Sequence, residues 1–218
     1  MRFFKLLCAS ALTVVCMTAG AHEFEALGEK FKFTEPEGYC ALDENSSSDK
    51  KLLQFLRKAA GKGLDLEYAA VHCSDLELLR NGDIELPEHY LGAGVLAIQG
   101  MVAKFPLDES LYLMLVSKLL NKQVVNSLVD RFNQKYQNKG GEISDTSFDM
   151  DQSGSFIFAN AQAHVKINSK FDRTIRAKAA SRLLKQVPLV FYVYDETDEQ
   201  ASYEKMDSAL KTVTDSLE

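Results

Sequence analysis

The sequence predicts an α+β fold: a single domain, mainly an antiparallel sheet packed with helices, behind an N-terminal signal peptide. The expected elements run as strands and one helix, then a helical middle, then two or three consecutive strands and a last helix. Consecutive strands joined by short turns favour antiparallel pairing, because neighbouring parallel strands need a long crossover connection. The 218 residues less the first 21 leave 197, which suits one domain over residues 22–218.

The first 21 residues have the three parts of a secretory signal peptide. Arg2 and Lys5 give a positive start, residues 6–18 form an uncharged apolar run, and Ala19-Gly20-Ala21 has small residues for cleavage. The run is too short for a membrane helix, which needs ~20 residues. We therefore expect cleavage between Ala21 and His22 and an exported protein with no membrane span after signal removal. It would be periplasmic in a Gram-negative source and secreted otherwise.

Signal removal makes the mature chain more acidic. It takes two of the 25 basic residues, Arg2 and Lys5, and none of the 31 acidic ones, which leaves a formal charge of −8. Nucleic acid and anionic membranes attract basic surfaces. The charge balance therefore argues against both as partners and leaves a protein or an envelope component.

The four cysteines divide between the signal peptide and the mature chain. Cys8 and Cys16 leave with the signal, whereas Cys40 and Cys73 remain as an even pair in a chain bound for an oxidising compartment. We predict a disulfide between Cys40 and Cys73, with two buried free thiols as the alternative. Closing this loop would add roughly 3–4 kcal/mol to stability.

The elements of the first half follow from short-range patterns. Alternation in "KFKF" indicates a strand, and the spacing of Leu52, Phe55, Leu56 and Ala59 indicates one face of a helix. A Ser-x-x-Glu capping box at Ser74 predicts a further short helix. The expected segments are strands over 24–34, 38–42 and 64–73, helices from about residue 48 to Gly61 and from Ser74 to Gly82, and a strand over 95–98.

The second half has clearer signals. Asp108 is placed to cap a helix through "LYLMLVSKLL", a second helical pattern ends at Gly140-Gly141, and the acidic stretch 144–153 is expected to be a mobile loop. The alternation of "SFIFANAQAHVKI" indicates an antiparallel strand with one wet side. The remaining segments are strands in "TIRAKAASRLL" and "PLVFYVYD", a turn at Lys185-Gln186, and a last helix whose apolar stripe holds Tyr203, Met206, Leu210, Val213 and Leu217.

His22 is the sharpest candidate metal ligand. As a new amino terminus it would offer an amine and an imidazole to one copper ion, an arrangement that resembles the histidine brace of secreted copper proteins. A brace needs a second histidine, and His72, His89 and His164 are available. The alternation of residues 64–72 makes His72 a core residue, His89 falls in an expected loop, and His164 lies on the polar side of its strand.

No catalytic motif is assembled in the sequence. It contains neither G-x-S-x-G nor a phosphate-binding loop, and no histidine pair has the spacing of a zinc protease. We therefore assign no catalytic residue and no cofactor, and expect a non-enzymatic protein that binds a protein or an envelope component. The alternative is an exported enzyme, with a dispersed hydrolase site or a copper site at His22.

Both ends of the mature chain resemble known proteins. "FKFTEPEGYCAL" and "PLVFYVYDETDEQASYEKMDSALKTVTDSL" are similar to segments of bacterial exported proteins of unknown function. The closing strand, acidic turn and amphipathic helix also look like the PsbP-type α/β/α sandwich. This resemblance implies binding and assembly-support roles without shared catalytic residues.

Overall fold

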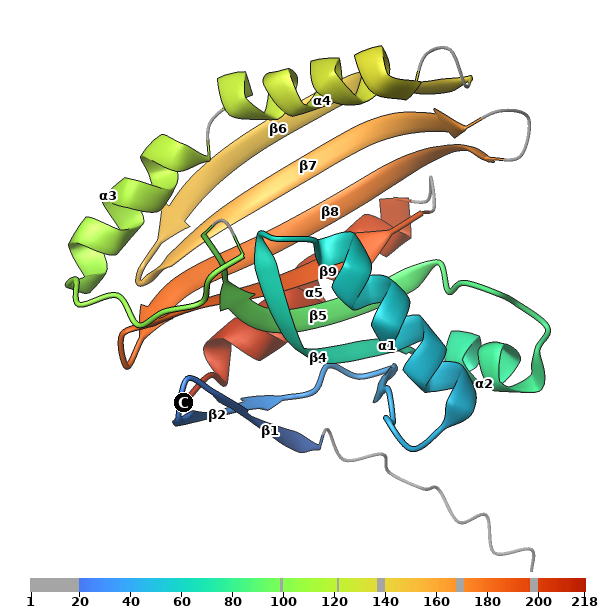
Figure 1. The fold of residues 1–218 in the computed structure, drawn as a ribbon. Helices are drawn as coiled ribbons and strands as arrows, with labels where there is room; N and C mark the ends of the chain where they lie inside the picture. The colour runs from blue at the N-terminus through green and yellow to red at the C-terminus, as the bar shows by residue number, and fades with distance from the viewer. Residues whose placement is uncertain (1–19, 99, 121, 137–139, 168–170, 197–199) are drawn as a thin grey trace, which may run out of the picture.

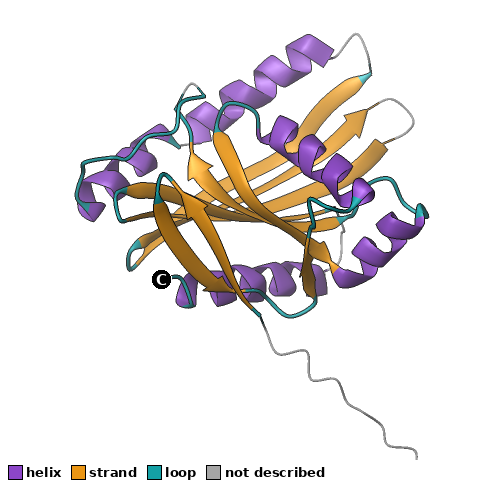
Figure 2. Cartoon of the chain, turned by 60° about the horizontal axis from the view of Figure 1, so that its bottom comes forward, coloured by secondary structure: helices purple, strands orange, loops and turns teal. Residues whose placement is uncertain are grey.

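The protein is an antiparallel sheet with helices on both faces, which confirms the predicted α+β class (Figures 1 and 2). The computed structural model describes residues 20–98, 100–120, 122–136, 140–167, 171–196 and 200–218. Within them, seven strands form one sheet in the order β3-β4-β5-β9-β8-β7-β6, and β1 and β2 form a separate hairpin. The predicted signal peptide falls almost entirely outside the described residues.

The element bounds agree with most sequence expectations. The strands are β1 (Ala21–Ala26), β2 (Glu29–Thr34), β3 (Tyr39–Ala41), β4 (Leu64–His72), β5 (His89–Leu96), β6 (Gly141–Ser153), β7 (Phe156–Ile167), β8 (Phe171–Leu184) and β9 (Val187–Asp195). The helices are α1 (Ser47–Ala60), α2 (Cys73–Asn81), α3 (Glu109–Leu119), α4 (Lys122–Tyr136) and α5 (Gln200–Asp215). No helix in this described part is long and apolar enough to cross a membrane.

The two faces of the sheet carry different layers. On one face, the β1–β2 hairpin and α5 bury a core around Phe31, Phe33 and Phe191, each at most 1% exposed. Full burial of such a side chain stabilises the fold by about 1.5–3 kcal/mol. On the other face, α1 and α2 pack on β4, and α3 packs on β7 and β8 (Figure 1). The C-terminal Glu218 exchanges two backbone hydrogen bonds with Lys32 of β2, which fastens the hairpin to the end of the chain.

The region 24–34 is a hairpin, so the prediction of a single strand there was wrong. The chain reverses at Leu27 and Gly28, which both have positive φ, at 52° and 77°. Two residues of this kind form the tight turn that matches the twist of two antiparallel strands. β1 then pairs with β2 along its whole length, from Ala21 opposite Thr34 to Ala26 opposite Glu29.

The acidic stretch 144–153 belongs to strand β6, which corrects the expectation of a mobile loop. β6 pairs with β7 from Gly141 to Ser153, and a register shift lies between Ser144 and Ser147. The side-chain amide of Asn160 on β7 donates to Asp149 at 2.8 Å. β6 is the edge strand of the sheet, and its repeated carboxylates discourage pairing with another chain.

Three smaller expectations also need correction. In α1, Leu53 rather than Phe55 is buried, and Phe55 is 48% exposed. α2 begins one residue before Ser74, with His72 as the N-cap and no side-chain cap bond, so the Ser74 capping box does not form. β5 begins at His89, earlier than predicted. Its Gly94 lies beside the bulge of β4, where a Cβ would come within 2.1 Å of the Asp65 carbonyl oxygen.

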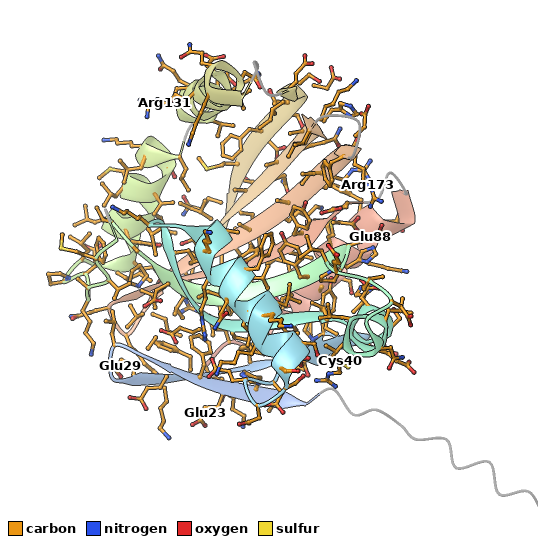
Figure 3. All side chains as sticks on the ribbon, turned by 45° about the vertical axis from the view of Figure 1, so that its right-hand side comes forward. Glu23, Glu29, Cys40, Glu88, Arg131 and Arg173 are labelled. Atoms are coloured by element: carbon orange, nitrogen blue, oxygen red, sulfur yellow. A yellow bond between two sulfur atoms is a disulfide. The ribbon has the colours of Figure 1, made fainter. Side chains whose placement is uncertain are left out.

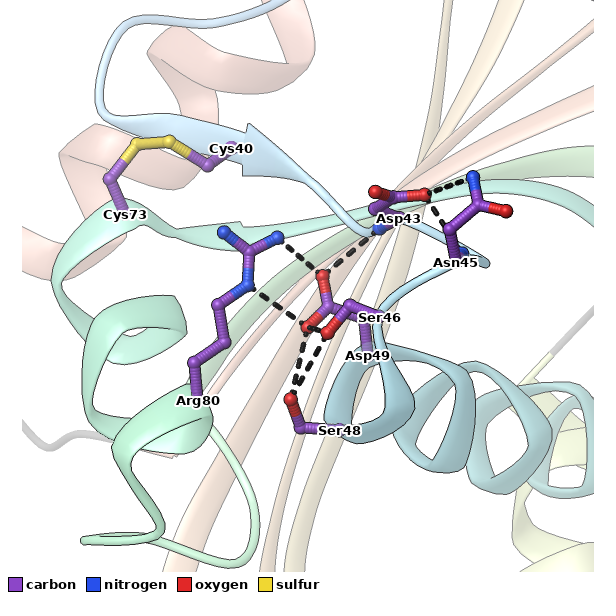
Figure 4. Close-up of polar contacts among 8 residues, drawn as sticks. All are labelled: Cys40, Asp43, Asn45, Ser46, Ser48, Asp49, Cys73 and Arg80. Carbon is purple, nitrogen blue, oxygen red and sulfur yellow. Dashed lines mark hydrogen bonds and ion pairs between the residues drawn. A yellow bond between two sulfur atoms is a disulfide. The ribbon is translucent and has the colours of Figure 1, made fainter.

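One buried carboxylate joins α1 to α2. Asp49 is fully buried and accepts hydrogen bonds from Nε and Nη2 of Arg80, at 3.1 and 2.6 Å, and from the Asp43 amide at 3.0 Å (Figure 4). The hydroxyl of Ser46 donates to Oδ1 of Asp49, which also accepts from Arg80 Nε, at 2.8 Å. Burial alone would raise the pKa of Asp49, but these hydrogen bonds outweigh it and lower the pKa to about 2.

Candidate functional site

A groove of about 560 Å³ lies beside the disulfide, between the turn before β3, the β4–α2 junction and α5. Its walls are mixed in character. The residues used below are Glu37, Tyr39, His72, Ser74, Lys205, Ser208 and Thr212. The groove therefore combines two aromatic rings with hydroxyls, an ammonium group and a carboxylate.

The predicted disulfide is present and holds this corner together. Cys40 of β3 is bonded to Cys73, the first residue of α2, with their Cα atoms 5.0 Å apart (Figures 3 and 4). The Cys73 amide also donates to the carbonyl of Gly38 at 2.9 Å. Gly38 has a φ of 83°, a conformation that glycine adopts without strain. The turn, β3 and the start of α2 are thus fixed together as one wall of the groove.

Two of the four histidines meet at the base of this wall. The rings of His72 and His89 are stacked, with centroids 4.4 Å apart and planes 11° from parallel. Tyr39 meets His72 edge-on, with a centroid distance of 4.8 Å. His89 is the first residue of β5, so its expected place in a loop was wrong. His72 is half-buried at the end of β4, where the strand meets α2.

The expected alternation of β4 is broken before it reaches His72. A register shift lies between Leu66 and Tyr68. As a result Leu66 packs with the α1 and α2 cluster, whereas Tyr68 packs in the core under α5. His72 therefore does not share one core face with both residues, which corrects the sequence interpretation.

Carboxylates surround the histidine stack. His89 Nδ1 lies 3.2 Å from Asp75 Oδ2, and His89 Nε2 lies 3.7 Å from Asp195 Oδ2. Burial lowers the pKa of His72, and the nearby His89 lowers it further. Burial raises the pKa of Tyr39, and the charges of Asp195 and Asp75 add to that rise. His72 and Tyr39 are therefore held neutral at the groove wall near neutral pH.

A second set of contacts joins the start of β5 to the end of β9, next to His89 and Asp195. Arg173 of β8 contacts Glu88 at 2.6 Å (Figure 3). It also contacts Glu196 at 3.5 Å. The Glu196 amide donates to the Glu88 carbonyl at 3.1 Å. Glu88 precedes His89 and Glu196 follows Asp195, so these contacts hold the histidine and its carboxylate in place.

The groove presents polar side chains, and the hydrogen bonds of the histidines show how these side chains are arranged. Among the described residues, no hydrogen bond joins a histidine to the side chain of a serine, threonine or cysteine. The base–nucleophile contact of a hydrolase is therefore not formed there. No group of three or more histidine, cysteine, aspartate or glutamate side chains in that part of the chain is arranged to hold a metal ion.

The other predicted positions lie apart from the groove. The ring of His22, on β1, packs against Tyr68 and Phe33, with centroids 4.2 and 5.6 Å away. Burial lowers the pKa of His22. His164 on β7 contacts Asp172 on β8 at 2.8 Å, near the surface. Ala21, the last residue before the predicted cleavage, begins β1.

Sequence reasoning missed most of the groove. Tyr39, Asp75 and Asp195 come from three distant segments, and only the antiparallel pairing of β3, β4, β5 and β9 brings these segments side by side. Tyr39 is paired with His72, and His89 with Asp195. Two of these contacts could have been found from the sequence had the strand register been known.

Comparison with known proteins shows likeness only among solved structures. No family model and no curated protein matches the chain. The chain is similar to the solution structure of cyanobacterial PsbP (CyanoP) from Synechocystis sp. PCC 6803, with 11% identity, coverage of 94% of this chain and 95% of that chain, and a TM-score of 0.44. It is also similar to the Saccharomyces cerevisiae Ran-binding protein Mog1p, with 11% identity, coverage of 92% and 96%, and a TM-score of 0.39. A PsbP protein, the type that the sequence resembles, is thus among the similar solved structures.

Proposed function

We propose that this protein is an exported, non-enzymatic binding protein that holds a polar segment of a protein or another envelope component in the groove beside the disulfide. The observation that carries the proposal is the convergence of three segments on this groove. Tyr39, His72 and Lys205 come from β3, β4 and α5, and the Cys40–Cys73 bond joins β3 to the first residue of α2, directly after β4.

The side chains indicate the chemistry of the bound group. Lys205 brings a positive charge, and Ser74, Ser208 and Thr212 bring hydroxyls that donate and accept hydrogen bonds. The neutral ring of His72 adds an apolar surface with a polar edge. A segment rich in oxygen acceptors, such as carboxylates, amides or sugar hydroxyls, is complementary to these groups.

Export is supported by the signal-like first 21 residues and by the disulfide, a bond typical of oxidising compartments. Binding rather than catalysis is supported by the state of the histidines. Both ring nitrogens of His89 face carboxylates, and His72 contacts two rings rather than a nucleophile. The enzymatic alternative would need a reactive group that this groove does not supply.

Affinity capture from an envelope extract of the native host tests the proposal. The wild-type protein is compared with Lys205→Glu, which reverses the charge at the groove, and with Lys58→Glu, a matched change at an exposed position of α1. We expect one captured component to be lost with Lys205→Glu and kept with Lys58→Glu. Identical capture by all three proteins would contradict binding in the groove.

A further inference from the structure

The outward face of α3 carries large apolar side chains beside the polar Ser117 and Lys118. Its inward residues Tyr112, Leu113 and Val116 pack on β7 and β8. A surface helix ordinarily turns polar residues outward. Here Leu111, Met114 and Leu119 are instead 45, 49 and 52% exposed. α3 therefore has apolar side chains on two sides. One side packs on the sheet, and the other is exposed in the single chain.

The neighbouring segment extends this apolar surface. Ile98 and Met101 form an isolated antiparallel bridge just after β5 and are 43 and 69% exposed. Between them and α3 lies a hollow of about 270 Å³, and its walls include Ile98, Phe105, Leu115 and Leu119. We define the α3 surface as six exposed residues: Ile98, Met101, Leu111, Met114, Leu119 and Leu120. Ile98, Leu119 and Leu120 line the same hollow, and exposed apolar residues that gather in this way mark interaction surfaces, whereas scattered ones need no explanation.

The charges at the two ends of α3 indicate what covers this surface. Asp108 and Glu109 lie at the start of the helix, and Lys118 and Lys122 lie at its end and just beyond it. When two copies of α3 pack antiparallel, the acidic end of each faces the basic end of the other, and their helix dipoles also oppose each other favourably. An anionic bilayer would instead meet a chain with a large excess of acidic residues.

We propose that the α3 surface binds a second copy of this chain, and that the two α3 helices pack antiparallel across a two-fold axis. Leu111, Met114, Leu115 and Lys118 have the i, i+3, i+4, i+7 spacing of one helix stripe. With the axis beside Met114 and Leu115, Leu111 of one copy lies opposite Lys118 of the other. The stem of Lys118 then covers Leu111, and its ammonium group lies one turn from Asp108 of the second copy.

Two-fold self-association fits the known preferences of soluble proteins. A closed dimer uses the same patch twice, so it leaves no complementary patch open to a third copy. The existing bonds of the acidic end are compatible with it. Asp108 accepts the Leu111 amide through Oδ1, and Glu109 accepts Arg182 through Oε1, which leaves each carboxylate a second oxygen for a lysine.

The dimer goes beyond the proposed binding function and is independent of it. The α3 surface shares no residue with the groove beside the disulfide. A variant that separates the copies should therefore still capture the groove's partner, and Lys205→Glu should leave the dimer intact.

Sedimentation equilibrium of the purified protein over a wide concentration range tests the proposal. We expect twice the monomer mass for the wild type. Met114→Glu places two carboxylates at the axis and should weaken the dimer at least tenfold, about 1.4 kcal/mol. Leu78→Glu changes a residue of α2 with similar exposure, 42%, and should leave the dimer unchanged. A monomer at every concentration, or equal weakening by both variants, would overturn the proposal.

Cysteine cross-linking tests the antiparallel register separately. Mild oxidation should join Met114→Cys to itself across the axis. Leu111→Cys should not join to itself. At a rise of 1.5 Å per residue, the two copies of residue 111 would lie about 10 Å apart along the direction of the helices. A mixture of Leu111→Cys and Lys118→Cys should form the cross-linked heterodimer. Self-linkage of Leu111→Cys would show parallel packing and contradict the proposed arrangement, and circular dichroism confirms that each variant is folded.

Discussion

The imidazole rings of His72 and His89 lie face to face, 4.4 Å apart, at the point where β4 and β5 reach the groove beside the disulfide. These strands are neighbours in the sheet, so their pairing holds the rings together. Burial disfavours the protonated form of His72, and the nearby His89 disfavours it further. His72 therefore couples the stability of this corner to pH.

Acidification should destabilise the protein through His72. Burial lowers the pKa of His72 in the folded protein below its ordinary value of about 6.5, so below that pH the unfolded chain binds more protons. Stability therefore falls as pH drops through about 6.5, and the fall continues down to the folded pKa. We expect His72→Gln to flatten this part of the curve, measured by urea unfolding from about pH 8 to about pH 5.

His22 provides the control for this measurement. Burial lowers its pKa as well, so it contributes a similar slope from a different part of the fold. His22→Gln should remove only the pH dependence of stability that comes from His22. The double variant should remove the pH dependence that comes from both histidines. An unchanged slope in His72→Gln would show that the stack does not sense pH.

Reduction of the disulfide should destabilise the protein and loosen the groove. The bond closes a sequence separation of 33 residues, for which the chain-entropy model gives roughly 3–4 kcal/mol. Once residues 1–21 are removed, the oxidised protein should contain no thiol that reacts with a labelling reagent, and the reduced protein should unfold at lower urea concentration. A Cys40→Ser and Cys73→Ser double variant should match the reduced protein. Two reactive thiols in the native exported protein would contradict the disulfide.

Loss of the Asp49–Arg80 contact should separate α1 from α2. Arg80→Ala leaves the buried Asp49 carboxylate without its two guanidinium hydrogen bonds, and we expect a loss of about 2–3 kcal/mol, since the exposed part of Arg80 already meets water. Asp49→Asn keeps the volume of the side chain and should cost less. The measurement is the free energy of unfolding at neutral pH.

The same contact has a distinct signature at low pH. The pKa of Asp49 is about 2 in the folded protein and about 3.9 in an unfolded chain, so its contribution is complete above the unfolded value and is lost as pH falls toward the folded one. Asp49→Asn should lose this acid-dependent component. Equal acid sensitivity in the variant and the wild type would assign the effect to other carboxylates.

The sequence predicted elements better than it predicted their contacts. Long periodic segments such as β7 and α5 were found because their side-chain alternation or stripe depends on the segment alone. The hairpin at Leu27-Gly28 was missed because alternating residues both precede and follow the two-residue turn, so the two strands read as one. β6 was taken for a loop because exposed carboxylates on an edge strand resemble loop composition.

The groove was less predictable because strand register determines it. His72 was noted, but its partner His89 falls in β5, whose glycines hide the strand pattern. Gly92 lies under the ring of Tyr192, where a Cβ would come within 2.4 Å of ring atoms, so the glycine is required by packing between strands. A single sequence contains no direct signal for such a contact.

Copper binding remains a separate prediction for the processed chain. If cleavage exposes His22, its amine and imidazole give two donors, but the described residues form no group of three ligating side chains. We therefore expect His72→Ala and His164→Ala to leave the Cu(II) affinity unchanged in a calorimetric titration. Loss of affinity in either variant would indicate a histidine brace. Equal affinity of His22→Ala and the wild type would show that His22 does not bind copper. A measurement of the intact mass must first confirm that His22 is the amino terminus.

Photocrosslinking in the native host tests the central claim, binding in the groove beside the disulfide, most directly. A benzophenone amino acid is placed at Ser208 on the groove wall and, as a control, at the exposed Lys58 of α1. We predict a defined envelope adduct from Ser208 that Lys58 does not give and that disappears when Lys205→Glu is added. The same adducts from both positions, or none from Ser208, would contradict the account.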